Sequence, residues 1–291
     1  RQCPVPEKYP KGYKAFYIMK YEISQGEYCD FLNTIDENQS NNRWSNKVGS
    51  DAGKKLSEEE AQDIRLKLRH FIKKASNGKF GCDANNNAGS GESADYSKMN
   101  EPDDGQWVAC GFISFSDIEA FLDWAALRPM TDLECEKAGR GPLEPIEKEF
   151  PWGDSKAEPY PTQIINAGTV NEKPDKGNCN YGRLRFPFRC GSFFDMGTTR
   201  HDRGSGYYGV LDLGGNVWER VITVANQQGR NFTGSNGDGI LSKDGDATNS
   251  DWPQGSYASG NTFKTGAFGC NIGYIYLSYR DWSEAHNGRV S

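Results

Sequence analysis

Residues 107–141, WVACGFISFSDIEAFLDWAALRPMTDLECEKAGRG, decide the fold class of this chain. The stretch opens with an apolar run typical of a strand and continues into a segment that Ser116 is expected to cap as a helix. Apolar side chains recur on one face of that helix at Ile118, Phe121, Leu122 and Ala125. Thr131 is expected to cap a second, shorter helix, which Gly139 and Gly141 end. The stretch therefore predicts a strand followed by two helices, the first of them buried.

The chain before this stretch shows the same order of strand and helix. Residues 13–23 alternate apolar and polar side chains like a half-buried strand, and helical spacing follows. Ser24 with Glu27 three residues later forms the capping-box pattern. Residues 56–75 predict another helix, and a polar, Gly/Asn-rich loop follows it. We interpret residues from about 40 to 106 as a helical and loop insertion.

The second half of the chain has almost no helical periodicity. Turn dipeptides such as Asn236-Gly237 and Asp244-Gly245 separate short apolar runs beyond residue 150. The chain has 34 Gly and 13 Pro, which favours many fixed turns over a helix bundle. Helices first and an irregular β region after them predict an α+β fold in a single domain, residues 1–291.

Charge and hydropathy exclude two classes of partner. The formal net charge is −6 with no evident basic patch, which argues against nucleic acid. No apolar stretch approaches the roughly 18 residues of a membrane span, so we expect no membrane insertion.

The eight cysteines are scattered and contain no C-x-x-C pair, which speaks against a zinc site. An even set in such a chain favours disulfides and a secreted or cell-surface location, with buried free thiols in a cytosolic core as the alternative. Cys82 and Cys110 are the first candidate pair because they bracket the polar stretch between them. The acceptor sequons at Asn38 and Asn231 are compatible with secretion.

Four segments, in order, resemble one family: residues 16–32 (FYIMKYEISQGEYCDFL), 107–141, 150–154 (FPWGD) and 207–221 (YYGVLDLGGNVWERV). The chain resembles the formylglycine-generating enzymes, the sulfatase-modifying-factor type. The resemblance implies their variant of the C-type lectin fold, which is irregular and loop-rich, with two main packed helices and a twisted antiparallel sheet.

The resemblance does not extend to the metal centre of the oxidase. That enzyme binds one copper ion through two cysteines, and Cys270 stands where the first would lie, while Ile275 or a neighbour takes the second position. A single thiolate cannot hold copper in this way, so copper is not expected. The iron-dependent branch needs clustered histidines, and His70, His201 and His286 are far apart in sequence. Whether the protein is an enzyme stays open, and the sequence favours that it is not.

The resemblance also implies a calcium site in the GGNVWE run. Asn216, Val217 and Glu219 would supply side-chain and carbonyl oxygens, which suit calcium. The alternative is that Asn216 and Glu219 satisfy buried turn amides.

The C-terminal segment carries the candidate ligand-binding face. It is formed by Tyr274, Tyr276, Tyr279, Arg280 and Trp282. Tyr, Trp and Arg are enriched at binding hot spots. Tyr274 and Tyr276 are alternatively inward-facing sheet residues, and Arg280 resembles a structural arginine of the family.

The leading hypothesis is a secreted or surface binding module, presenting this face to an unknown protein or glycan ligand. The alternatives are a hypervariable ligand-binding protein of the diversity-generating-retroelement type, a metal-dependent oxidoreductase, or a structural subunit of a surface appendage or secretion apparatus. The family continues into a Gly-Phe-Arg closing strand where this chain stops at Arg289-Val-Ser291. Either the sequence is incomplete, or a neighbouring chain fills the gap by strand addition.

Overall fold

The computed structural model describes residues 4–44, 66–90, 93–253 and 259–280. Its elements, in chain order, are α1 (Gln25–Thr34), α2 (Glu37–Arg43), β1 (Ile72–Lys74), β2 (Phe80–Cys82), η2 (Tyr96–Lys98), α4 (Phe115–Trp124), α5 (Asp132–Arg140), β3 (Ile164–Ile165), β4 (Lys173–Pro174), η3 (Phe194–Met196), β5 (Glu219–Ile222), α6 (Gln227–Arg230), β6 (Asn261–Lys264) and η4 (Ile272–Ile275). Short helices mixed with small antiparallel sheets are consistent with the predicted α+β class. None of the described helices has the length and apolar character that crossing a membrane requires.

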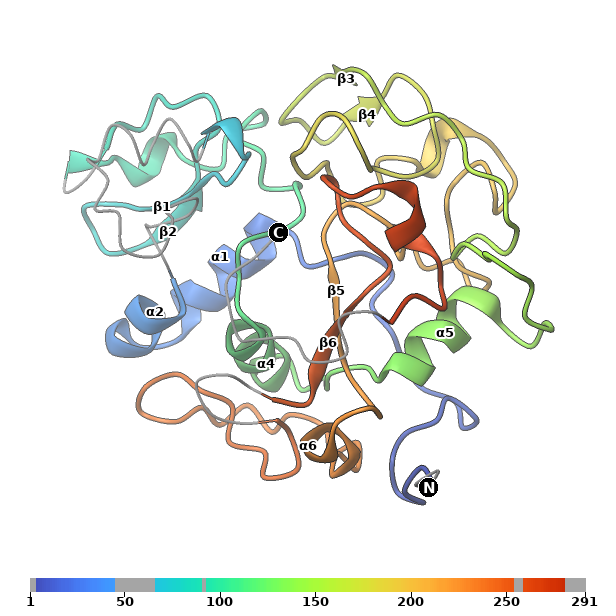
Figure 1. Ribbon diagram of the computed structural model, residues 1–291. Helices are drawn as coiled ribbons and strands as arrows, with labels where there is room; N and C mark the ends of the chain where they lie inside the picture. Colours follow the sequence, from blue (N-terminus) through green and yellow to red (C-terminus); the bar gives the residue numbers. More distant parts are fainter. Residues whose placement is uncertain (1–3, 45–65, 91–92, 254–258, 281–291) are drawn as a thin grey trace.

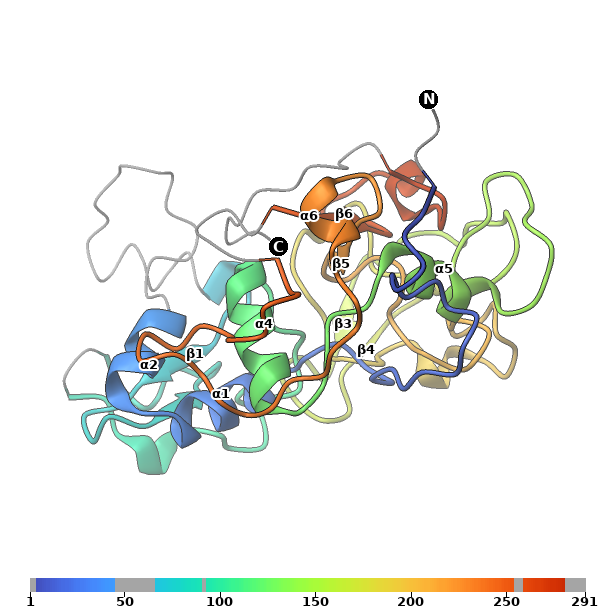
Figure 2. The same cartoon turned by 90° about the horizontal axis from the view of Figure 1, so that it is seen from below.

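The antiparallel pair β5–β6 lies in the middle of the molecule (Figure 1). Its register places Glu219 opposite Lys264 and Ile222 opposite Asn261. The helices α1 and α2 and the β1–β2 pair lie on one side of it, and α5 lies on the other side, as the turned view also shows (Figure 2). In the described residues, the expected sheet therefore takes the form of separate two-stranded pairs.

Local capping explains where the main helices begin. Ser24 and Thr131 cap α1 and α5 with complete capping boxes, as predicted. The helix α4, however, starts two residues earlier than predicted, because Ser114 and not Ser116 is its N-cap. The Ser114 side chain accepts a hydrogen bond from the Asp117 amide, and the Asp117 carboxylate accepts one from the Ser114 amide.

The insertion differs from its prediction at the end of the expected helix 56–75. Residues 45–65 lie outside the described part of the chain, but residues 72–74 are a strand and not a helix. Arg69 has a left-handed backbone with φ 55°, which ends helical geometry just before this point. Ile72 then pairs with Cys82 and is fully buried. Strand pairing between residues 72–74 and 80–82 thus overrides the helix that the sequence predicted for residues 72–74.

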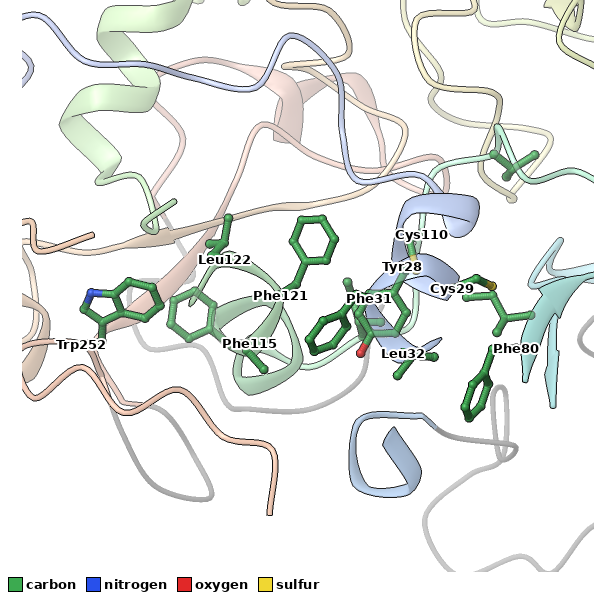
Figure 3. Packing of buried hydrophobic residues seen from close by; sticks show 14 of the residues in the cluster. Tyr28, Cys29, Phe31, Leu32, Phe80, Cys110, Phe115, Phe121, Leu122 and Trp252 are labelled. Atoms are coloured by element: carbon green, nitrogen blue, oxygen red, sulfur yellow. The ribbon is translucent and has the colours of Figure 1, made fainter. Parts of the chain in front are cut away.

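The largest hydrophobic cluster joins α1, α4 and the β1–β2 pair (Figure 3). Tyr28 and Phe31 of α1 lie 5.5 Å apart between ring centroids, and Phe31 meets Phe121 of α4 edge-on at 5.9 Å. Aromatic pairs in this geometry add to the stabilisation that apolar burial provides. This cluster holds the insertion against the two helices.

The predicted disulfide between Cys82 and Cys110 is not formed in the structure. Both residues are buried free thiols of the large cluster. Figure 3 shows Cys110 within it. The Cys82 sulfur instead lies 4.0 Å from the sulfur of Cys29, because β2 packs against α1. The other described cysteines are also free thiols.

Candidate functional site

A cavity of about 500 Å³ lies between the N-terminal extended segment, α4 and the beginning of β5. Consecutive residues from Ala15 to Met19 form one wall, and Ile118 and Leu122 of α4 also line the cavity. Val217, Trp218 and Glu219 complete the lining beside β5. A mostly apolar cavity with a few polar groups is the usual form of a ligand site.

The wall formed by residues 15–19 has an unpaired backbone. The sequence predicted a strand over residues 13–23, but the structure has no strand there: residues 15–19 run without a bend between bends at Lys14 and Lys20, and the bridge that follows the range is Ser24–Ala109. Among the described residues, none makes a backbone hydrogen bond to residues 15–19. The Tyr17 side chain is fully exposed. This segment therefore presents free N–H and C=O groups beside the cavity.

Two carboxylates, Glu22 and Glu219, form the acidic pair of the cavity. Glu134 also lines it, but Arg128 neutralises Glu134 through hydrogen bonds of 2.6 and 2.8 Å. Among the described residues, none donates a hydrogen bond to the Glu219 carboxylate or forms an ion pair with it. Among the described residues of the lining, the acidic pair thus has no oppositely charged partner.

Burial and mutual repulsion shift the pKa values of this region. Burial raises the pKa of Glu22 well above its usual range, and the charges of Asp212 and Glu219 raise it further. Burial raises the pKa of Asp212 to about 6, against hydrogen bonding from Gly191. Burial and the Asp212 charge raise the pKa of Glu219 to about 8. Carboxylates held together in this way favour binding of a cation.

Asn216 positions Glu22 rather than pointing a free oxygen at a metal. Its side-chain N–H group donates to Glu22 Oε2 at 2.6 Å, and the Val217 amide donates to Glu22 Oε1 at 2.9 Å. The Asn216 side-chain oxygen accepts hydrogen bonds from Asn180 Nδ2 at 2.9 Å and from the Phe188 amide at 2.8 Å. Asn216 thus satisfies buried groups, which is the alternative that the sequence left open.

The donor set for the predicted calcium site is therefore reduced. The Asn216 oxygen is already used by two donors, whereas the carboxylate of Glu219 and the nearby Asp212 remain suitable oxygen ligands. Only Glu101, Asp103 and Asp104, among the described residues, bring three carboxylate oxygens within 4.8 Å of one another. Calcium at Asn216, Val217 and Glu219 stays a prediction.

The tyrosines of the predicted C-terminal face have different neighbours in the structure. Tyr274 lies near Trp218 of the cavity lining, with ring centroids 6.2 Å apart, and Tyr279 lies 5.0 Å from Tyr274. Tyr276 instead packs on Phe150 at 5.0 Å. Tyr274 thus adjoins Trp218 of the cavity lining, and Tyr279 packs on Tyr274.

The remaining two members of the face have different outcomes. Arg280 forms ion pairs with Glu136 and, at 4.0 Å, with Asp132, so it ties the C-terminal segment to α5. This is the structural arginine that the sequence offered as an alternative. Trp282 lies outside the described residues.

The residues expected for copper or iron do not form a suitable donor set among the described residues. Ile275, which with its neighbours was expected at the position of the second copper cysteine, is fully buried and packs with Phe150 and Cys179. Cys270 is partly buried, and burial raises the pKa of its thiol. His70 packs against an aromatic ring, His201 binds two carboxylates, and His286 lies outside the described residues.

Sequence reasoning missed Glu22, Asp212 and the cavity. Glu22 lies in a segment that was interpreted only as a strand, and Asp212 stands in the 207–221 segment just before the residues chosen for calcium. Their convergence depends on contacts between distant parts of the chain. The available signal was an acidic residue at the end of an apolar, alternating segment.

Comparison with known proteins agrees with the resemblance of the four segments. No curated protein matches the chain. The sequence model of the sulfatase-modifying factor enzyme 1-like domain matches residues 5–273. Because this match covers most of the chain, the protein belongs to the FGE-sulfatase, or sulfatase-modifying factor enzyme 1-like, domain family.

Proposed function

We propose that this protein is a binding module that takes up an extended segment of a protein ligand along residues 15–19. The observation that carries the proposal is the unpaired, extended backbone of this segment beside a cavity of about 500 Å³. An extended peptide can add to such an edge through main-chain hydrogen bonds, while the adjacent cavity accepts its side chains. A protein ligand is favoured over a glycan because a glycan offers no matching row of backbone groups.

Aromatic residues support the binding role. Trp218 lines the cavity, and Tyr274 and Tyr279 extend the aromatic surface beside it. Such side chains bury a large area with little loss of conformational entropy. The predicted C-terminal face therefore contributes to the site through these two tyrosines.

A copper-dependent oxidation is not part of the proposal. The chemistry of that enzyme needs two thiolates, and the resemblance puts Ile275 or a neighbour, not a cysteine, at the second position. The proposal includes the C-type lectin-like variant of the fold, which the family resemblance supports. It also includes a secreted or cell-surface location, which the exposed sequon residues Asn38 and Asn231 support.

Hydrogen–deuterium exchange tests the proposal. A short capped peptide of alternating threonine and valine with a central norleucine is the probe, because it is extended and carries no charge. We expect it to slow exchange of the amides of residues 15–19, and Tyr17→Pro to weaken its binding, because proline removes one N–H group.

The control is Tyr13→Pro. Tyr13 is also exposed and precedes the same segment, but it does not line the cavity. Equal binding by the two variants, or unchanged exchange at residues 15–19, would show that no strand adds at this edge.

A further inference from the structure

Two cationic side chains lie over one aromatic ring at the start of η3. Lys20 Nζ is 5.2 Å from the ring centroid of Phe194, and Arg203 Cζ is 4.3 Å from the same centroid. Lys20 Nζ also lies 5.2 Å from the ring centroid of Tyr21. Phe194 is 37% exposed and Tyr21 is 41% exposed, so this group lies at the surface of the molecule. We call Lys20, Phe194 and Arg203 the cationic cluster.

Contacts with the main chain hold both cations in place. The Lys20 carbonyl accepts a hydrogen bond from the Leu211 amide at 2.9 Å, which fixes the backbone at this residue. Arg203 Nε donates to the Gly197 carbonyl at 2.9 Å. The two Nη groups of Arg203 have no hydrogen-bond partner among the described residues. A guanidinium that is fixed at Nε and stacked on a ring is preorganised to bind an oxyanion through both Nη groups.

Neither cation of the cluster is neutralised by a carboxylate. Among the described residues, none forms an ion pair with Lys20 or Arg203. The carboxylate of Asp202 instead accepts hydrogen bonds from two amides of its own turn, at 3.2 and 3.0 Å. Asp195 is exposed and pairs with no cation in the described part of the chain. Two neighbouring positive charges repel each other, so an anion that interacts with both is favoured.

We propose that the cationic cluster binds a phosphoryl group. A phosphate monoester carries about −1.5 to −2 charges at pH 7 and three strong acceptor oxygens, so it can accept from Arg203 and pair with Lys20 at the same time. A carboxylate carries a single charge and would leave one cation without a counter-charge. None of the three residues of the cluster lines the cavity beside β5, so this inference does not depend on the proposed function.

NMR titration of the isotope-labelled chain at neutral pH and low ionic strength tests the inference. The probes are inorganic phosphate, a capped alanine–phosphoserine–alanine peptide and sodium acetate. We expect phosphate to shift the amide signals of residues 194–197 saturably, Arg203→Gln to weaken binding about tenfold and Lys20→Gln about threefold. Asp195→Asn should tighten binding about twofold, because it removes a nearby negative charge. Lys176→Gln is the matched control, since Lys176 is also exposed but is not part of the cluster.

The results decide for or against the phosphoryl site. Saturable shifts that Lys20→Gln weakens, that Asp195→Asn strengthens and that Lys176→Gln leaves unchanged support it. Tighter binding of the phosphoserine peptide than of inorganic phosphate would then assign the group to a protein partner, and the reverse order would assign it to a small molecule. Shifts that sodium chloride reproduces at the same ionic strength would show screening alone and overturn the inference.

Equal affinity for acetate and phosphate would also overturn it, because the cluster would then not distinguish two charges from one. The Lys20→Gln variant keeps the test decisive if Arg203→Gln does not fold. The Lys20 side chain is exposed and makes no hydrogen bond among the described residues, so its replacement removes only the charge.

Discussion

Arg69 and Glu172 form a buried ion pair that joins the insertion to the rest of the molecule. Arg69 Nη1 lies 2.9 Å from Glu172 Oε1, and both residues are buried. Arg69 Nη1 also donates to the Pro187 carbonyl at 2.7 Å, while the Glu172 carboxylate accepts from the amides of Gly168 and Arg189. Loss of either charge would therefore leave the buried carbonyl and amide groups around the pair without their charged hydrogen-bond partner.

Replacing Glu172 by Gln is expected to destabilise the protein by about 3 kcal/mol, because it leaves a buried guanidinium without its counter-charge. Urea unfolding followed by tryptophan fluorescence measures the change. Glu147→Gln serves as control, since Glu147 pairs with Lys148 at 3.8 Å on the surface and its loss should cost under about 0.5 kcal/mol. Similar losses in the two variants would contradict the structural role of the Arg69–Glu172 pair.

His201 gives the stability of the protein a pH dependence. Its Nδ1 lies 2.8 Å from Asp154 Oδ2 and its Nε2 lies 3.0 Å from Glu158 Oε1. Burial lowers the pKa of His201, but hydrogen bonds to Glu158 and Asp154 outweigh this effect and raise it above the ordinary value of 6.5. Protonated His201 therefore stabilises the folded state. This stabilisation is fully present below pH 6.5 and is lost as the pH rises through the raised pKa of His201 in the folded state.

We expect His201→Gln to lose stability relative to the wild type at pH 5.5 and to match it at pH 9. Since the His201 side chain is 23% exposed and those of Asp154 and Glu158 are 36% and 47% exposed, solvent screening should keep the difference below about 1 kcal/mol. Urea unfolding of both proteins at the two pH values checks this. A larger loss at pH 9 than at pH 5.5 would reverse the sign and contradict the assignment.

The local capping patterns predicted the starts of α1 and α5 correctly, but placed the start of α4 two residues too late. Ser24 and Thr131 are true caps because a capping box needs only residues within one turn. The sequence predicted the α4 cap at Ser116, whereas the structure places it at Ser114. The helix includes Phe115, which is fully buried in the main cluster, so the cap must precede Phe115. That requirement comes from packing and not from the local pattern.

The site was less predictable than the helices because its residues come from distant segments. The sequence identified Glu219, but the role of Asn216 depends on hydrogen bonds with Asn180 and Phe188. Glu22 faces the cavity only because the Val217 amide and Asn216 hold its carboxylate. Such contacts follow from closure of the whole fold, which no spacing within one segment encodes.

The free thiols predict an order of chemical labelling. Cys29 and Cys82 are buried, and the hydrogen bond between the two sulfurs, together with burial, raises the pKa of the Cys82 thiol well above its usual range. Cys270 is only partly buried. Because iodoacetamide reacts with exposed thiolates, we expect native protein to be labelled at Cys270 first and at Cys82 only after unfolding. Peptide mass mapping of native and urea-treated samples measures this order.

Oxidation provides a second test of the same cluster. Since Cys29 is the sulfur found 4.0 Å from Cys82, oxidised protein is expected to contain a Cys29–Cys82 link. Mapping under non-reducing conditions identifies the linked peptides. A link between Cys82 and Cys110 would restore the pairing expected from the sequence and contradict the arrangement of α1 and β2.

Gly141 ends α5 in a position that only glycine fits. Its φ is 73°, and a Cβ atom there would lie 2.2 Å from the Tyr207 ring. Gly78 is the matched control, because its φ is 83° and a Cβ atom would meet nothing within 4 Å. We expect Gly78→Ala to cost about 1 kcal/mol from backbone strain alone. Gly141→Ala should cost roughly 2–3 kcal/mol, since the ring of Tyr207 must also move. Urea unfolding of both variants gives the difference, and equal costs would mean that Tyr207 does not pack over the end of α5.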